Sequence, residues 1–260
     1  MCHGSYTFPF PRPFKWVKHI FLILYCVCTI PESPAQPSLE GLNPPLISFN
    51  FVANGESLKS DTDYVNPFGE RYQVRTLMFY VSRIRLSNSV GTSTGHDKEY
   101  HLIDYSNAAS HTVSLKAPKG PYDSIQFMLG VDSFHNTSGA QTGALDPLHG
   151  MFWTWNSGYI FAKFEGLVAR SSGSHIPFAH HVGGFRPGED AQRLVLLTLP
   201  PHRIIEVKEQ HSPRIEITVE VSRWFNGKHA LSLADYPTVM TPGAKSMLAA
   251  DNVSTIFSIQ

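Results

Sequence analysis

Cysteine is scarce in this sequence, and its scarcity excludes several kinds of protein. The 260-residue chain has three cysteines, Cys2, Cys26 and Cys28, so no thiol follows position 28. The remainder therefore has no disulfide framework and no thiolate ligands for structural zinc, an iron–sulfur cluster or blue copper. A chain of about 225 residues buries enough surface to fold without disulfides, so export to an oxidising compartment stays open.

Neither sign of charge is in excess. The sequence has 21 basic and 21 acidic residues, without a long run of either. Binding to nucleic acid or to an acidic membrane depends on a concentration of positive charge, which this sequence lacks. We therefore expect no nucleic-acid partner.

The motifs of several enzyme classes are also missing. The sequence has no G-x-S-x-G elbow, no H-E-x-x-H helix, no phosphate-binding glycine loop and no dinucleotide fingerprint. Acidic residues such as Asp132, Asp146 and Glu165 offer oxygen atoms to calcium, but without EF-hand spacing. We expect a binding protein without catalytic turnover.

The first 35 residues differ in composition from the rest. Basic residues precede an apolar run at 20–30, and small residues at Ser33 and Ala35 follow it. This is the layout of a secretory signal peptide, and the run is too short to span a bilayer comfortably as a permanent anchor. The expected organisation is a signal peptide at 1–35, a proline-rich linker at 36–45 and one domain at 46–260.

This organisation predicts a periplasmic or secreted protein. Cleavage of the leader would leave no stable membrane insertion. A retained leader, or lipidation of Cys28, would instead tether the protein to the membrane.

Short β-prone runs separated by turn residues follow the linker. Their alternation and spacing predict an all-β fold, a single antiparallel β-sandwich with long loops. A short helix is expected near the end, at 244–251, after Pro242-Gly243. The expected strands are 46–52, 72–86, 100–104, 111–115, 122–131, 151–155, 159–170, 176–182, 193–199, 204–207 and 214–221.

The stretch 130–166 carries the most distinctive residues. It begins with a polar loop that has no helical period and that contains His135 and His149. The loop leads to Trp153 and Trp155, which are two residues apart and would share one face of a strand. Paired tryptophans in a β-sandwich are commonly core residues, so a functional role for them needs a further observation.

A histidine cluster follows. Adjacent residues of a strand point to opposite faces, so His180 and His181 cannot both enter one site unless the strand is bulged. We expect His181 to point inward, as a metal ligand or as a structural hydrogen-bonding residue. In the preceding strand, Lys163 and Glu165 are expected to share the polar side.

Four motifs in order give the sequence a family resemblance. They are GVDS at 130–133, SGAQTGALDP at 138–147, GMFWTWNSGYIFAKFEG at 150–166 and FAHHVGG at 178–184. With them, the chain from about Ile47 to its end resembles the methanobactin-associated copper-binding proteins, the MbnP-like domain.

The resemblance implies an exported copper-binding protein. In that family histidines and a tryptophan oxidised to kynurenine form the copper site, and a di-haem cytochrome c peroxidase-like partner enzyme performs the oxidation. His181 matches the histidine of the family's aromatic-x-x-His-x-Gly pattern. Trp153 is the first candidate for the modified residue and Trp155 the second, with His135 as the candidate second histidine.

The sequence departs from the copper-binding members at its first strand. Phe49-Asn50-Phe51 has no histidine two residues after an aromatic residue, so a two-histidine site would recruit His135, His149 or another residue. The alternative is an extracellular β-sandwich interaction module that binds a protein or a glycan through its loops without metal. An imidazole beside one of the indoles would favour copper, and indoles sealed among apolar side chains would favour the module.

Overall fold

The alternating runs of the sequence pair into two β-sheets that pack face to face. The computed structural model describes residues 44–94, 97–209, 211 and 213–259. The expected leader at 1–35 and nearly all of the expected linker lie outside these residues. Within the described part, no helix is long and apolar enough to cross a membrane.

The larger sheet is organised around its longest strand, β4 (Arg71–Ser87). Strand β11 pairs with β4 along one edge and with β12 along the other, antiparallel in both cases. In spatial order this sheet comprises β13 (Arg193–Thr198), β8 (Ser124–Leu129), β4, β11 (Ala162–Ala169), β12 (His175–Val182) and β16 (Thr238–Val239), with β3 (Tyr64–Val65) and β5 (Tyr100–Asp104) also paired to β4.

The smaller sheet contains strands from both ends of the domain. Its members in spatial order are β17 (Phe257–Ile259), β15 (Arg214–Glu220), β1 (Leu46–Ala53) and β2 (Glu56–Ser57), with β6 (Thr112–Ser114) also paired to β1. Strands β1 and β15 are parallel, as are β12 and β16. The all-β prediction is confirmed, but the sheets are mixed, because long connections between these strands permit parallel pairing where a tight hairpin would not.

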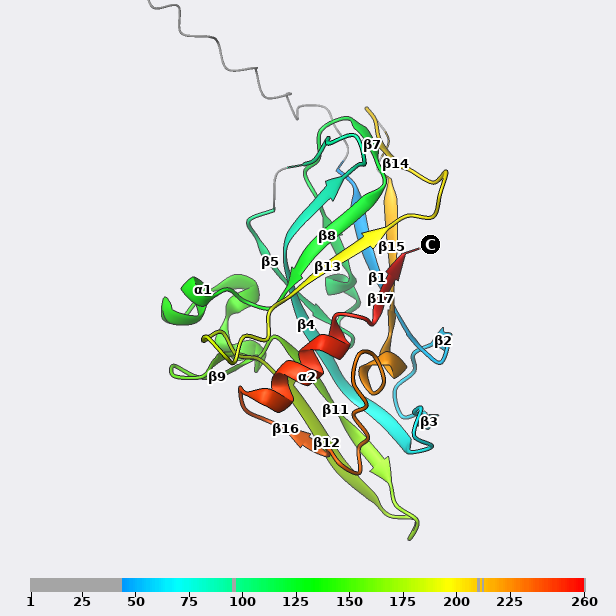
Figure 1. Cartoon of the computed structure of the whole chain (residues 1–260), viewed down its shortest axis with the longest axis vertical. Coiled ribbons are helices and arrows are strands. Elements are labelled where there is room, and N and C mark those ends of the chain that lie inside the picture. The colour runs from blue at the N-terminus through cyan, green and yellow to red at the C-terminus, as the bar shows by residue number, and fades with distance from the viewer. Residues whose placement is uncertain (1–43, 95–96, 210, 212, 260) are drawn as a thin grey trace, which may run out of the picture. The chain divides into compact units, whose positions relative to one another are not determined.

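Two short ribbons and a few helical turns complete the fold. The ribbons pair β7 (Gly120–Tyr122) with β14 (Ile205–Val207), and β9 (Phe152–Thr154) with β10 (Gly158–Tyr159). The predicted C-terminal helix is α2 (Ala244–Val253), which contacts β12 (Figure 1). The remaining helical segments are α1 (Ser133–Thr137), η1 (Ala108–His111), η2 (Gly143–Leu145), η3 (Pro147–His149) and η4 (Val221–Trp224).

Aromatic side chains fill the space between the sheets. Phe79 of β4 and Phe127 of β8 meet Phe49 of β1 and Phe257 of β17 edge to face, with ring centroids 5.2 to 6.1 Å apart. Such pairs contribute about 0.5–1.5 kcal/mol beyond the burial of their area. The four rings therefore join both sheets into one core.

The opposite face of the larger sheet is covered by the connection between β8 and β11, here called the 130–161 excursion. Tyr80 of β4 is fully buried on this outer face, and its hydroxyl donates to the carbonyl oxygen of Ala144 at 3.0 Å. Tyr159 donates in the same way to Leu145 at 2.6 Å. Figure 1 shows the excursion, with α1 and β9, projecting to one side of the larger sheet.

The excursion contains a short helix, α1, that the sequence pattern does not predict. Asp132 accepts a hydrogen bond from the backbone N–H of His135 and so caps α1, which spans five residues. The region has no apolar periodicity because a helix this short is held by its cap and its contacts rather than by an amphipathic face.

His180 is a core residue of the larger sheet. It is fully buried, accepts a hydrogen bond from the indole N–H of Trp224 at 3.0 Å, and donates from Nε2 to the carbonyl of Tyr236 at 2.6 Å. Burial lowers the pKa of His180, so the ring stays neutral and serves as a fixed link between β12 and the segment 224–236.

The Trp224–His180 hydrogen bond provides a test of this core. Trp224→Phe should reduce the free energy of unfolding by about 1–3 kcal/mol. The substitution removes the indole N–H that donates to the buried Nδ1 atom of His180, and this atom would then have no hydrogen-bond partner. Urea denaturation measures the loss. In a His180→Leu background the same substitution should cost less, since the nitrogen is already absent, and equal costs in both backgrounds would contradict the coupling.

Candidate metal site

Strand β12 places its two adjacent histidines on opposite sides of the sheet. Phe178, His180 and Val182 alternate toward the core, and all are essentially buried. His181 points to the other face of the sheet, where the excursion covers it, so it is buried but lies outside the sandwich core. The reason is the register: His180 lies opposite the buried Phe164, whereas His181 lies opposite Lys163 on the outer face.

His181 is nevertheless almost inaccessible, at 8% exposure. Its Nε2–H donates to the Glu165 carboxylate at 2.7 Å, which leaves the lone pair on Nδ1. This Nδ1 atom is buried and has no hydrogen-bond partner in the described structure. A histidine held by a carboxylate through one nitrogen, with the other bare, is the arrangement that orients metal-ligating imidazoles.

Glu165 is set up to stay ionised. Burial raises the pKa of its carboxyl, but the hydrogen bonds from His181 and Thr76 and the nearby charge of Lys163 outweigh burial, so the net pKa lies below its ordinary value. Lys163 and Glu165 lie on the same side of β11, as the sequence alternation predicts, and both are partly buried. Lys163 also donates to the carbonyl of Gly150, which ties the excursion to β11.

Trp153 lies on the same outer face. A Cβ atom at Gly183 would be 2.8 Å from the indole Cζ3 atom, so the ring packs directly over this glycine. Gly183 follows His181 by two residues, directly after the end of β12, so the indole packs beside the end of the strand that carries His181. The indole Nε1–H of Trp153 is buried and has no hydrogen-bond partner in the part of the chain described.

Trp155 has a different environment. Strand β9 ends at Thr154, so Trp155 lies beyond the strand and does not share the setting of Trp153. Its side chain is 65% exposed and contacts Phe152 edge to face at 5.5 Å. The two tryptophans thus differ: Trp153 is partly buried with a buried Nε1 atom, and Trp155 is a surface residue.

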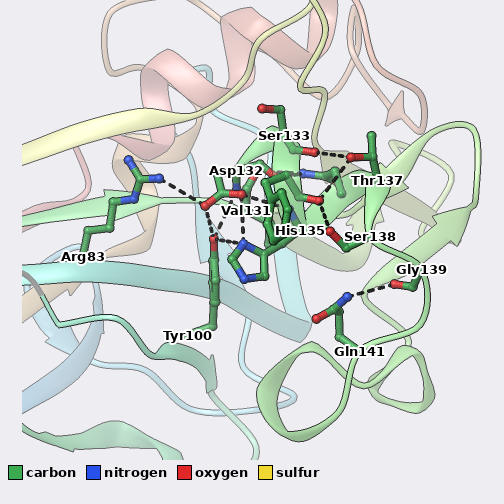
Figure 2. A network of polar contacts seen from close by, with 12 residues as sticks. Arg83, Tyr100, Val131, Asp132, Ser133, His135, Thr137, Ser138, Gly139 and Gln141 are labelled. Atoms are coloured by element: carbon green, nitrogen blue, oxygen red, sulfur yellow. Dashed lines mark hydrogen bonds and ion pairs between the residues drawn. The ribbon is translucent and has the colours of Figure 1, made fainter. Parts of the chain in front are cut away.

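His135 belongs to another cluster, shown in Figure 2. Its Nδ1–H donates to Asp132 at 2.9 Å, and its ring packs against Tyr100 with centroids 4.8 Å apart. Asp132 also accepts from the Tyr100 hydroxyl at 2.8 Å and from Arg83 at 3.1 Å. Burial raises the pKa of Asp132, but the backbone and ring hydrogen bonds of His135 and the bond from Tyr100 outweigh it and bring the pKa to about 2.

The strand register separates this cluster from His181. His181 is aligned through β11 with Met78 of β4, whereas Tyr100 is aligned with Ser82. The two rows are four residues apart, or ~13 Å of strand, and β12 and β5 are also three strand positions apart, ~14 Å. The structure therefore does not bring His135 to His181.

Other histidines have local roles. His149 contacts the carbonyl of Gly143 within its own turn at 3.0 Å, and His101, His111 and His229 each bond to an aspartate side chain or a nearby carbonyl. Among the described residues no three His, Cys, Asp or Glu side chains are grouped so as to hold a metal ion. Any metal site here must therefore draw on other donor types.

Comparison with known proteins now decides the family. The sequence profile of the MbnP family matches residues 43–241, which include His181, Trp153 and the whole excursion. The chain belongs to the MbnP family. Membership confirms the resemblance found in the sequence, and the family is one of accessory proteins rather than enzymes, as expected.

A solved structure supports the same assignment. MbnP from Methylosinus trichosporium superposes with a TM-score of 0.55 and 16% sequence identity, covering 84% of this chain and 98% of that one. At this identity the similarity establishes the MbnP fold. No curated protein matches the sequence at a significant level.

Gly183 offers a direct test of the Trp153 packing. In Gly183→Ala the new Cβ would lie 2.6 Å from the Tyr159 carbonyl oxygen and 2.8 Å from the indole, so the ring must move. We expect a loss of about 1–3 kcal/mol in unfolding free energy and a shifted Trp153 resonance in the ¹⁹F spectrum of 5-fluorotryptophan-labelled protein.

Gly188→Ala is the control for the resonance, because a Cβ there meets open space and the substitution strains only its own backbone, which has a φ of 81°. It should leave the Trp153 resonance in place. An unshifted resonance in Gly183→Ala would contradict the packing.

Proposed function

We propose that this protein binds copper outside the cytoplasm, with His181 and an oxidised Trp153 as ligands. One observation carries the proposal: two nitrogens of the outer face, Nδ1 of His181 and Nε1 of Trp153, are both buried and both lack partners. Buried polar atoms are rarely left unpaired without a functional reason. The proposal goes beyond family membership, which concerns the fold and the accessory role.

The donor chemistry suits copper. Imidazole nitrogen is a good ligand for copper, and a thiolate is not required. The Glu165 hydrogen bond presets the His181 tautomer, so Nδ1 offers its lone pair without rearrangement. A bound copper ion would use this nitrogen, which the protein otherwise leaves bare.

Oxidation would give the second donor. An intact indole only donates a hydrogen bond and has no lone pair for a metal. Oxidative cleavage of the indole C2–C3 bond adds two oxygen atoms, and hydrolysis then releases C2 as formate, which leaves kynurenine with an aryl amine and a ketone that can bind a metal. We assign the modification to Trp153 rather than Trp155, since Trp153 packs over the His181 face, and we expect a di-haem cytochrome c peroxidase-like partner to supply the oxidising equivalents.

The first strand explains how this member differs from the expected two-histidine pattern. Phe51 is 7% exposed and packs against the His111 ring at 5.0 Å, with the core Phe79 on its other side. Its environment is apolar and belongs to the sandwich interior. His181 is therefore the single imidazole that we assign to copper, and export follows from the expected leader at 1–35.

The alternative function, a metal-free interaction module, has one observation in its favour. Three large apolar side chains of the excursion are strongly exposed, Phe134 at 70%, Leu148 at 92% and Trp155 at 65%. Exposed apolar groups of this size are typical of contact surfaces. This surface is compatible with either function, since a modifying enzyme must also dock beside Trp153.

Mass spectrometry of protein from its native envelope, with its copper content, separates the two functions. We expect a gain of about four mass units on the peptide with Trp153 and Trp155, assigned by fragmentation to Trp153, together with bound copper. Trp153→Phe and His181→Ala should each lose copper, while Trp155→Phe and His149→Ala should keep it. Unmodified tryptophan and no copper in protein from copper-replete cells would favour the module.

Glu165 should tune the affinity without being a ligand. Glu165→Gln removes the charged acceptor of the His181 Nε2–H, and we expect copper affinity to fall about 10- to 100-fold. Competition with a chromogenic copper chelator measures the change. Glu56→Gln, on the exposed strand β2 of the smaller sheet, is the control and should bind as wild type; an unchanged affinity in Glu165→Gln would exclude the orienting role.

A further inference from the structure

The outer face of the larger sheet has a second feature, which copper binding does not use. Beyond the His135 cluster lies a cavity of about 680 Å³ bounded by β4, β5, β8, β13 and α1. Its volume falls in the range typical of small-molecule sites. We propose that this cavity binds a small neutral molecule with an apolar body and one hydroxyl group, of the alkylphenol type.

The floor of the cavity follows from strand register. Leu194 lies opposite Met128, Met128 opposite Ser82, and Ser82 opposite Tyr100, so one row crosses four strands. Directly opposed residues present their side chains to the same face. The row therefore changes from apolar at Leu194 and Met128 to polar at Ser82 and Tyr100.

Ser82 gives the cavity an unsatisfied polar group. The residue is 2% exposed, lines the cavity, and its hydroxyl has no hydrogen-bond partner in the described structure. A buried hydroxyl without a partner is costly to maintain, and an apolar residue would pack there at no such cost. A serine at position 82 is explained if a bound ligand supplies the missing hydrogen-bond partner of its hydroxyl.

Backbone strain accompanies this position. The register of β4 against β8 shifts between Ser82 and Arg85, and Arg83 has a φ of 51° in the left-handed region. Bulges of this kind redirect side chains and are common beside binding sites. Here the bulge separates Ser82, which faces the cavity, from the core residues that follow it.

The hydrogen bonds of His135 indicate which functional group a ligand must carry. Its Nδ1–H is committed to Asp132, so Nε2 is an acceptor, and His135 lines the cavity. A ligand that meets both Nε2 and the Ser82 hydroxyl must donate one hydrogen bond and accept another. A hydroxyl group does both, whereas an ether only accepts.

The charges around the cavity favour a neutral ligand. Two cations, Arg83 and Lys98, and two carboxylates, Asp97 and Asp132, line it. Arg83 is paired with Asp132, and Asp97 with His101. An anionic ligand would meet both carboxylates and a cationic ligand both cations, so neither sign is favoured.

Leu194 and Leu196 give a matched pair of variants. Both lie on β13 and are exposed to a similar degree, 56% and 59%, but only Leu194 lines the cavity. Leu194→Glu and Leu196→Glu should therefore fold equally well. Ser82→Ala removes only the unpaired hydroxyl and should not destabilise the protein.

Titration of the full protein with 4-propylphenol tests the proposal, with calorimetry for affinity and the Met128 methyl resonance for location. We expect a dissociation constant on the order of 0.1–1 mM, given the size of the probe. Leu194→Glu should weaken binding at least about tenfold and Leu196→Glu should not. Ser82→Ala should weaken 4-propylphenol about fivefold but leave propylbenzene unchanged, because only the hydroxyl meets Ser82.

Several outcomes would overturn the proposal. They are no saturable binding of 4-propylphenol up to its solubility, equal effects of the two leucine variants, or tighter binding of 4-propylbenzoate than of the phenol. His181→Ala should leave phenol binding unchanged, so the result is independent of the copper proposal.

Discussion

The structure depends on the paired segment of β11 and β12 around His181, where both faces of the sheet are covered. One face packs Phe164, Phe178 and His180 into the sandwich core, where Trp224 satisfies the imidazole. The other face carries Glu165 and His181 and is covered by the 130–161 excursion rather than by a second sheet. On this covered face the Nδ1 atom of His181 and the Nε1 atom of Trp153 have no hydrogen-bond partner among the described residues. Both ring nitrogens of the core residue His180, in contrast, are hydrogen-bonded.

The excursion also organises the outer face into two separate regions. Near β12, Trp153 packs over Gly183 and belongs to the His181 region. Near β5, Asp132 caps α1 and gathers Tyr100, His135 and Arg83 around one carboxylate, beside the cavity of β4, β8 and β13. Tyr80, anchored to Ala144 between them, fixes the excursion to β4. One connection thus contributes residues to both of the proposed sites.

Family membership and site chemistry carry different information. The match over residues 43–241 and the fold similarity to MbnP from Methylosinus trichosporium account for the sandwich and the excursion. Neither comparison assigns ligands to this chain, and Phe51, at the first-strand position where the resemblance implies a histidine, is a buried core residue. The ligands of this member are therefore inferred from its own unpaired atoms.

The sequence by itself determined the strands, the terminal helix and the family, because alternation, turn residues and motifs are local patterns. It also placed His180 and His181 on opposite faces, but it did not reveal that both are buried, one in the sandwich core and the other beneath the excursion. Only the tertiary structure decided that His180 faces the core, that Trp153 is partly buried while Trp155 is exposed, and that His135 contacts Tyr100. These outcomes depend on strand register and on the path of the excursion, which bring together residues distant in the sequence and leave no signal in any short segment.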